Sequence, residues 1–94
     1  MFKVNDYYEG KVKSVGFENK NGNFTVGVMA TGEYEFGTST TEYMSIISGE
    51  MKVMLPGESQ WKIYKPFETF IVPKDSKFKI VVEDTACSYL CRYE

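Results

Sequence analysis

The chain contains no histidine, so side-chain chemistry must come from carboxylates, hydroxyls, thiols, aromatic rings and the cations of lysine and arginine. Its only arginine is Arg92. A guanidinium can bind an oxyanion through two parallel hydrogen bonds, whereas a lysine offers a point charge. Arg92 is therefore the candidate for holding an anion such as phosphate. A salt bridge on the surface or at a subunit interface would explain the same residue about equally well.

The two cysteines, Cys87 and Cys91, lie four residues apart in a segment that is typical of a β-strand. In an extended strand this spacing separates their Cα atoms by roughly 13 Å, which exceeds the roughly 7 Å that a disulfide tolerates. A catalytic thiol needs a neighbouring base such as histidine, which the chain lacks. We therefore expect two small buried thiols on one face of the strand.

The elements that must position these residues are short strands. Runs of Val, Ile, Tyr, Phe and Thr alternate with Gly, Pro, Asn and Asp, and no long helical pattern occurs. The dipeptide Asn21-Gly22 predicts a hairpin turn, because both residues tolerate positive φ. So many short strands in so small a chain favour a closed barrel or a two-sheet jelly roll, which removes exposed edges. The nine predicted strands are Gly10–Phe17, Asn23–Met29, Gly32–Thr38, Glu42–Ser48, Glu50–Met54, Trp61–Tyr64, Thr69–Val72, Ser76–Val82 and Cys87–Tyr93.

Length and composition limit the class of protein. A chain of 94 residues with 43% hydrophobic and 26% charged side chains fits one globular domain, residues 1–94. The net charge of −2 and the scattered lysines argue against a nucleic-acid partner. No apolar run could span a bilayer and residues 1–13 contain no signal-peptide core, so we expect a cytoplasmic protein without membrane contact. Because so short a chain buries a modest share of its surface, we also expect a homodimer.

Two segments resemble the paired motifs of the cupins, a superfamily of small double-stranded β-helix barrels. The first motif begins at Glu42 and ends at Gly49, and the second runs from Phe70 through Pro73 to Phe78. In cupins these motifs supply three histidines and a glutamate that together hold a metal. Here only Glu42 remains, and Phe78 stands about where the last histidine would be. Because a transition-metal site needs three or four ligands, we expect neither a metal nor any other cofactor.

A resemblance to one family covers nearly the whole chain. The stretches that carry it are Asn5–Phe17, Val26–Met29, Gly32–Phe36, Glu42–Met44, Ile47–Gly49, Leu55–Pro56, Trp61, Tyr64, Phe70–Pro73, Ser76, Phe78 and the distinctive Ser88–Tyr93. In these stretches the chain is similar to the pyrimidine/purine nucleoside phosphorylases, a family of small, metal-free, cupin-like bacterial proteins. The resemblance implies phosphorolysis, in which inorganic phosphate attacks C1′ of a purine or pyrimidine nucleoside and releases free base and a pentose 1-phosphate. Phe67 departs from the family, which tends to have a glycine there, and this puts the local backbone in doubt.

The cupin resemblance also implies an interior site around Glu42, where cupins point a metal ligand inward. Strand alternation then turns Met44 and Ile46 inward with it. We expect Glu42 and Arg92 to be the catalytic residues, because together they would place an acceptor for ribose hydroxyls beside an anion site. That pairing requires Arg92 to face inward. A carboxylate kept only to balance the arginine is the alternative, and Tyr89 lies on the opposite face of the last strand from Arg92.

The expected substrate-binding residues are three hydroxyls and three aromatics, namely Thr38, Ser39, Thr40, Tyr34, Phe36 and Tyr89. The hydroxyls stand where the cupin histidines would be and could bind phosphate or sugar oxygens, although a polar loop at the barrel mouth explains them about as well. The aromatics could stack on a base, and stacking tolerates every base. Any one of them could instead belong to the core.

Two other functions stay open on the sequence. Because no acid, base or nucleophile is obvious, the barrel could bind a small metabolite without catalysing a reaction. It could also be a structural dimer whose interior is filled, in which case no cavity would lie near Glu42.

Overall fold

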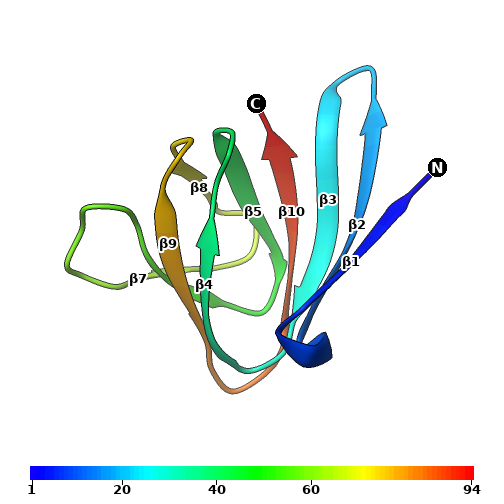
Figure 1. Cartoon of the computed structure of the whole chain (residues 1–94). Helices are drawn as coiled ribbons and strands as arrows, with labels where there is room; N and C mark the ends of the chain where they lie inside the picture. The colour runs from blue at the N-terminus through cyan, green and yellow to red at the C-terminus, as the bar shows by residue number, and fades with distance from the viewer.

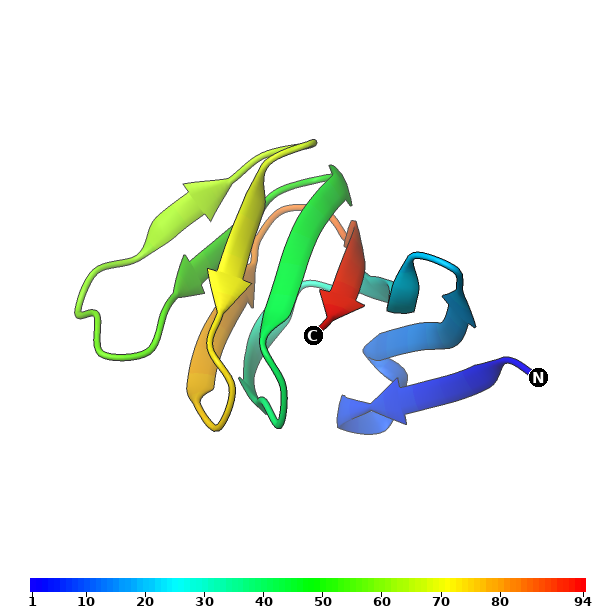
Figure 2. The ribbon, with the colours of Figure 1, turned by 90° about the horizontal axis from the view of Figure 1, so that it is seen from above.

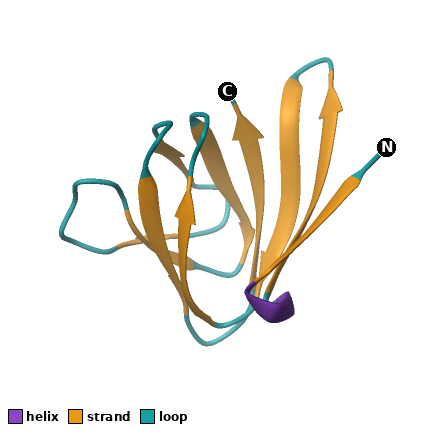
Figure 3. Ribbon diagram, viewed as in Figure 1, coloured by secondary structure: helices purple, strands orange, loops and turns teal.

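The computed structural model describes residues 1–94 and consists almost entirely of β-strands (Figure 3). Its one helical segment, η1, spans three residues, and no helix could cross a membrane. All nine predicted strands are confirmed, with bounds that agree to within two residues. The elements are β1 Lys3–Tyr7, η1 Tyr8–Gly10, β2 Val12–Asn19, β3 Gly22–Met29, β4 Gly32–Gly37, β5 Glu42–Ser48, β6 Met51–Met54, β7 Lys62–Tyr64, β8 Thr69–Val72, β9 Lys77–Val82 and β10 Cys87–Tyr93.

The strands form two antiparallel sheets that face each other (Figures 1 and 2). One sheet has six strands in the order β1-β2-β3-β10-β5-β8, and the other has four in the order β4-β9-β6-β7. The last strand of the chain, β10, lies between β3 and β5 and so joins distant parts of the sequence. No hydrogen-bonded ladder connects the two sheets. The two sheets therefore form a sandwich, which corresponds to the two-sheet jelly roll among the predicted alternatives.

Alternate side chains of most strands point between the sheets and form the core. Met44 and Ile46 of β5 are buried, as predicted, and Phe78, Ile80 and Val82 of β9 face them from the other sheet. Fully burying an aliphatic or aromatic side chain contributes roughly 1.5–3 kcal/mol. Sixteen buried residues make up one continuous cluster, so the two sheets are held together mainly by apolar contact.

The first strand, β1, was not predicted from the sequence. Its residues are mostly polar and exposed, and Asn5 and Asp6 have low strand propensity. It nevertheless pairs with β2, from Lys3 opposite Gly16 to Tyr7 opposite Val12, and forms the edge of the six-stranded sheet (Figure 1). The strand conformation of β1 therefore depends on its pairing with β2, because β1 has no alternating hydrophobic pattern of its own.

A left-handed turn follows β1. Tyr8, Glu9 and Gly10 have φ values of 54°, 56° and 87°. For a residue with a side chain, this conformation costs roughly 1–2 kcal/mol. The Tyr8 hydroxyl donates to the Glu35 carbonyl at 2.7 Å and accepts from the Glu35 N–H at 3.0 Å. These bonds tie the six-stranded sheet to the free edge of β4.

Two local predictions have different outcomes. The hairpin between β2 and β3 is present, but its two loop residues are Lys20 and Asn21, and Gly22 already pairs with Asn19. Only Gly22 has a positive φ, at 134°, so the predicted turn was one residue late. The doubt about Phe67 has a physical basis: its φ is 72°, in the region that glycine adopts without strain, and the residue is 88% exposed.

Candidate functional site

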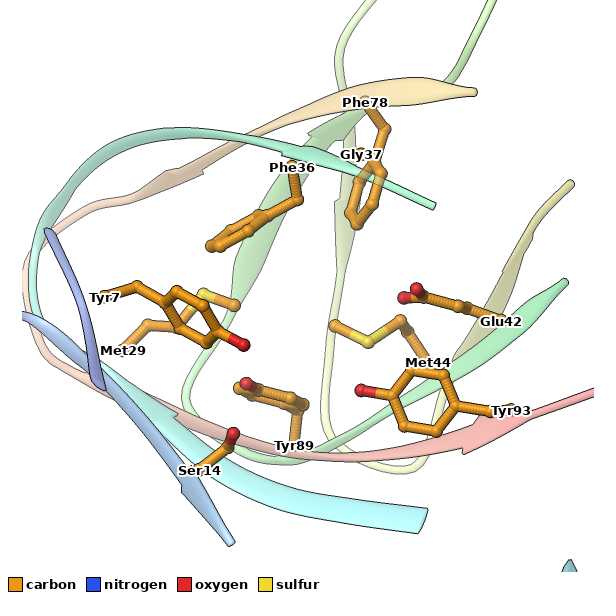
Figure 4. A pocket seen from close by; sticks show the side chains of 10 residues that line it. All are labelled: Tyr7, Ser14, Met29, Phe36, Gly37, Glu42, Met44, Phe78, Tyr89 and Tyr93. Carbon is orange, nitrogen blue, oxygen red and sulfur yellow. The ribbon is translucent and has the colours of Figure 1, made fainter. Parts of the chain in front are cut away.

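A cavity of about 110 Å³ lies between the two sheets, and its wall is largely aromatic (Figure 4). Sites that enclose a whole small molecule usually measure roughly 300–1,000 Å³. This cavity therefore holds one part of a ligand and leaves the rest at its mouth. Because it lies beside Glu42, the structure disfavours a filled, purely structural barrel. The lining residues are Tyr7, Ser14, Met29, Phe36, Gly37, Glu42, Met44, Phe78, Tyr89 and Tyr93.

Glu42, the first residue of β5, points into the cavity, as predicted (Figure 4). The thiol of Cys91 donates to its Oε1 atom at 3.6 Å. Burial raises the pKa of the Glu42 carboxyl above its ordinary value, and the hydrogen bond from Cys91 opposes this shift in part. The site thus contains a carboxyl group that takes up a proton more readily than an exposed glutamate does.

Tyr93 lies beside Glu42, because the two residues are direct partners on β10 and β5. Its hydroxyl shares a hydrogen bond of 3.0 Å with Thr25 Oγ1. Burial raises the pKa of both Tyr93 and Cys91, so each keeps its proton near neutral pH. We refer to Glu42 and Tyr93 as the carboxyl end of the cavity.

Three hydroxyls gather at the other end of the cavity, those of Tyr7, Ser14 and Tyr89 (Figure 4). Ser14 Oγ accepts a hydrogen bond of 3.1 Å from the Asn5 side-chain amide. Burial raises the pKa of Tyr89 to about 12, so its phenol also stays protonated. We refer to these three residues as the hydroxyl end, which is neutral and rich in donors.

The structure places two of the three predicted aromatic contact residues on the cavity wall. Phe36 and Tyr89 line the cavity. Tyr34 does not: it is buried outside the cavity wall, and its hydroxyl donates to the Ala30 carbonyl at 2.6 Å. Its ring fixes the turn before β4, so its expected role in substrate binding is not supported.

The predicted hydroxyl run does not reach the cavity wall either. Thr38 Oγ1 donates to the Pro73 carbonyl at 2.7 Å and accepts from the Ser76 N–H at 3.0 Å, which joins two loops. Ser39 is exposed, and the Thr40 hydroxyl is buried without a hydrogen-bond partner. The structure therefore favours the polar-loop interpretation of this segment over the substrate-binding one.

The expected pairing of Glu42 with Arg92 is wrong. The Arg92 guanidinium donates to the Glu94 carboxylate at 2.8 Å and stacks 4.2 Å over the ring of Tyr43, on the outer face of the sheet. The inward residues of β10 are the alternate ones, including Tyr89 and Cys91. No lysine or arginine lines the cavity.

Sequence reasoning missed three polar residues of the wall, namely Tyr7, Ser14 and Tyr93. Strand alternation places Tyr93 on the same face as Tyr89, and this could have identified it. Tyr7 carried no such signal, because its strand was not predicted. The two cysteines are free and buried, as predicted.

The donor set at this site does not fit a transition metal. No group of three or more His, Cys, Asp or Glu side chains lies close enough together to hold one. Glu42 and the Cys91 thiol supply fewer than the three or four ligands that such an ion needs. The chemistry of the cavity is that of a carboxyl group, hydroxyls and aromatic rings.

Comparisons with known proteins agree with the fold. The family model described as pyrimidine/purine nucleoside phosphorylase matches residues 2–93. A protein of that name from Pseudomonas entomophila is 53% identical over 94 residues, which cover 99% of this chain and 98% of the relative. The crystal structure of a protein of unknown function from Vibrio parahaemolyticus is 41% identical with a TM-score of 0.95, and the match covers 100% of this chain and 99% of that one.

A more distant structure identifies the fold class. An RmlC-like cupin from Shewanella frigidimarina has a TM-score of 0.76 over 98% of this chain and 82% of its own, at 17% identity. This likeness concerns the fold alone. The predicted cupin-like, all-β class is confirmed.

Proposed function

Because the chain belongs to the pyrimidine/purine nucleoside phosphorylase family, we propose that it is an enzyme that catalyses phosphorolysis of purine and pyrimidine nucleosides. Inorganic phosphate attacks C1′, and the glycosidic bond breaks with its electron pair going to the base nitrogen. The nitrogen takes the proton that hydrogen phosphate gives up. The products are the free base and a pentose 1-phosphate, so atoms and charge balance without a cofactor.

The observation that supports this reaction best is the half-buried carboxyl of Glu42, which points into an aromatic, hydroxyl-lined cavity. Cleavage of a glycosidic bond passes through a state that resembles an oxocarbenium ion. A carboxylate close to the sugar accepts hydrogen bonds from its hydroxyls and stabilises the positive charge that develops. Glu42 is thus the residue to which we assign pentose binding and electrostatic stabilisation.

The aromatic wall fits acceptance of both classes of base. Phe36 and Phe78 lie with their ring centroids 6.0 Å apart on the wall opposite the carboxyl-bearing sheet. An aromatic face binds any base by stacking and does not read the hydrogen-bonding edge. The base would lie against these rings at the mouth, because the cavity of about 110 Å³ does not hold a whole nucleoside.

Phosphate-dependent release of base tests the proposal. The protein is incubated with uridine, and separately with adenosine, with and without inorganic phosphate, and base and pentose 1-phosphate are measured by chromatography. We expect equal amounts of the two products, and only when phosphate is present. No phosphate-dependent release at high protein concentration would overturn the proposal.

Glu42→Gln is the matched control for a contaminating phosphorylase. The amide has nearly the same shape but cannot carry the negative charge, so we expect a loss of about 100-fold or more in kcat/KM for the nucleoside. A preparation of Glu42→Gln with wild-type activity would contradict the assignment, because either this carboxyl takes no part or the activity comes from a contaminant. A chelator should leave the wild-type rate unchanged.

One observation favours a second candidate function, the binding of a small metabolite without catalysis. No cation lines the cavity, and its volume suits a small neutral molecule better than a nucleoside and phosphate together. Thermal stabilisation by nucleosides in the absence of any turnover would support this alternative. Turnover in the assay above would exclude it as the sole function.

A homodimer in the cytoplasm completes the proposal. Val15 and Val26 are cross-strand partners on the outer face of the six-stranded sheet, and they are 40% and 42% exposed. Leu90 lies opposite Val26 on the next strand, so the apolar row continues across β10. A second copy packed on this face would remove these side chains from water. Light scattering after size-exclusion chromatography should give twice the mass of one chain, and Val26→Lys should give the mass of one.

A further inference from the structure

We propose that inorganic phosphate binds at the hydroxyl end of the cavity, and that Tyr7 donates a hydrogen bond to it as a further catalytic residue. The inference rests on the proposed function, since it assigns one substrate of that reaction to one part of the site. Tyr7 was not among the site residues predicted from the sequence. The inference is based on the arrangement of groups in the cavity, where the carboxyl group lies at one end and the hydroxyl donors lie at the other.

The two ends of the cavity differ in charge. Glu42 lies at one end, whereas Tyr7, Ser14 and Tyr89 gather at the other (Figure 4). Phosphate is an anion at neutral pH, and a like charge in a partly buried site repels it strongly. The hydroxyls of a pentose are neutral donors that a carboxylate accepts well. The phosphate therefore belongs at the hydroxyl end and the pentose at the carboxyl end, with C1′ between them.

The hydroxyls at this end are available to a ligand. The Tyr7 hydroxyl makes no hydrogen bond within the protein and points into the cavity (Figure 4). Ser14 Oγ accepts from Asn5 at 3.1 Å and also makes a side-chain hydrogen bond with the Tyr89 hydroxyl, so a ligand at this end competes with Tyr89 for the Ser14 hydrogen. The Tyr89 phenol is buried and protonated. Three neutral donors thus converge where the wall has no cation.

The adjacent residue Tyr8 shows the contrast. Both hydrogen-bonding capacities of its hydroxyl are used by the Glu35 backbone, at 2.7 and 3.0 Å, and its ring does not line this cavity. Tyr7 packs edge-on against Phe36 with ring centroids 6.3 Å apart, which orients its free hydroxyl inward. The strained turn that follows Tyr7 holds the strand end in this place, and strain of this kind is often concentrated at functional sites.

Neutral donors suit a phosphate that must act as a nucleophile. Hydrogen bonds to the oxygens that do not react hold the group in line with C1′. A lysine or arginine in contact with phosphate would stabilise its charge in the ground state and make the attacking oxygen less nucleophilic. With Tyr7, Ser14 and Tyr89 as donors, one oxygen stays free to form the bond to C1′.

The matched pair Tyr7→Phe and Tyr8→Phe tests the inference, because each variant removes one phenol hydroxyl from neighbouring residues. For Tyr7→Phe we expect the KM for phosphate to rise about tenfold or more, with the KM for the nucleoside within about twofold of wild type. For Tyr8→Phe we expect a lower Tm and an unchanged KM for phosphate. Ser14→Ala should act in the same direction as Tyr7→Phe.

A second measurement separates this inference from the proposed function. Inorganic phosphate alone is added to the wild type and to Tyr7→Phe, and the shift in Tm is recorded without nucleoside. Stabilisation of the wild type that Tyr7→Phe loses supports the phosphate site even if no turnover is found. Equal stabilisation of both proteins, no stabilisation of the wild type, or a rise confined to the KM for the nucleoside would overturn it.

Discussion

The phenol ring of Tyr89 lies across Gly27, its direct partner on the neighbouring strand β3. A Cβ atom built at position 27 would overlap the Tyr89 ring and its hydroxyl. The φ of Gly27 is not positive, so the position demands space rather than glycine's conformational freedom. The missing side chain on one strand thus makes room for an aromatic wall residue on the other.

Substitution of Gly27 by alanine should displace Tyr89 from the cavity wall. Overpacking of this kind usually costs about 1–3 kcal/mol, so we expect the free energy of unfolding in urea to fall by that amount. We also expect kcat/KM for phosphorolysis to fall about tenfold or more, because Tyr89 is part of the hydroxyl end. Gly16→Ala is the control, since its Cβ would meet nothing closer than 3.6 Å. Equal activity of the two variants would contradict the proposed importance of this packing.

The raised pKa of Glu42 predicts a pH-dependent contribution to stability. The folded state binds this proton more tightly than the unfolded chain does. The resulting stabilisation is complete below the ordinary pKa of 4.5 and is lost as pH rises through the higher pKa of the folded state. Glu42→Gln stays neutral and lacks this dependence.

Urea unfolding of the wild type and Glu42→Gln between about pH 4 and pH 8 measures this effect. We expect the wild type to lose stability relative to Glu42→Gln as pH increases and the difference to level off once the carboxyl is ionised. The pH at which it levels off should also mark the lower limb of the kcat/KM profile, because the proposed reaction uses the carboxylate. A difference that does not depend on pH would show that burial leaves the pKa of Glu42 unchanged.

Arg92→Ala should have little effect on turnover. The guanidinium lies on the outer face with Glu94 and Tyr43, and an exposed pair of this kind contributes about 1 kcal/mol or less. We expect kcat/KM for both substrates to stay within about threefold of wild type, which steady-state kinetics can measure. A loss beyond tenfold would contradict the placement outside the site and indicate that Arg92 acts in the cavity of a second copy.

Phe67→Gly should stabilise the protein. The left-handed backbone at Phe67 costs roughly 1–2 kcal/mol, whereas glycine loses about 0.5–1 kcal/mol through its more flexible unfolded chain. The residue is 88% exposed, so little packing is lost. We expect a net gain of about 0.5–1 kcal/mol in urea unfolding. Phe67→Ala keeps the left-handed strain and should be close to neutral; an equal gain in both variants would locate the effect in the exposed ring instead.

Local patterns in the sequence were sufficient to predict most of the fold. A strand side chain points to one face or the other with period two, and turn residues interrupt the pattern, so nine of the ten strands could be identified with nearly correct bounds. The cupin-like motif around Glu42 predicted its inward direction and that of Met44 and Ile46. These features depend on neighbouring residues, and a single sequence contains that information.

The tertiary structure alone decided which residues share the cavity. Alternation shows that Tyr89 and Arg92 lie on opposite faces of β10, but the long-range pairing of β10 between β3 and β5 determines which face is the inner one. Tyr7 reaches the cavity because β1 pairs with β2, and the polar strand itself gives no sign of this. Alternation shows which residues of a strand share a face. Only the pairing of distant strands decides which of the two faces points into the cavity. For that reason the sequence indicated an interior carboxylate, and the fold placed phenols and a serine in the same cavity, with the arginine on the outer face.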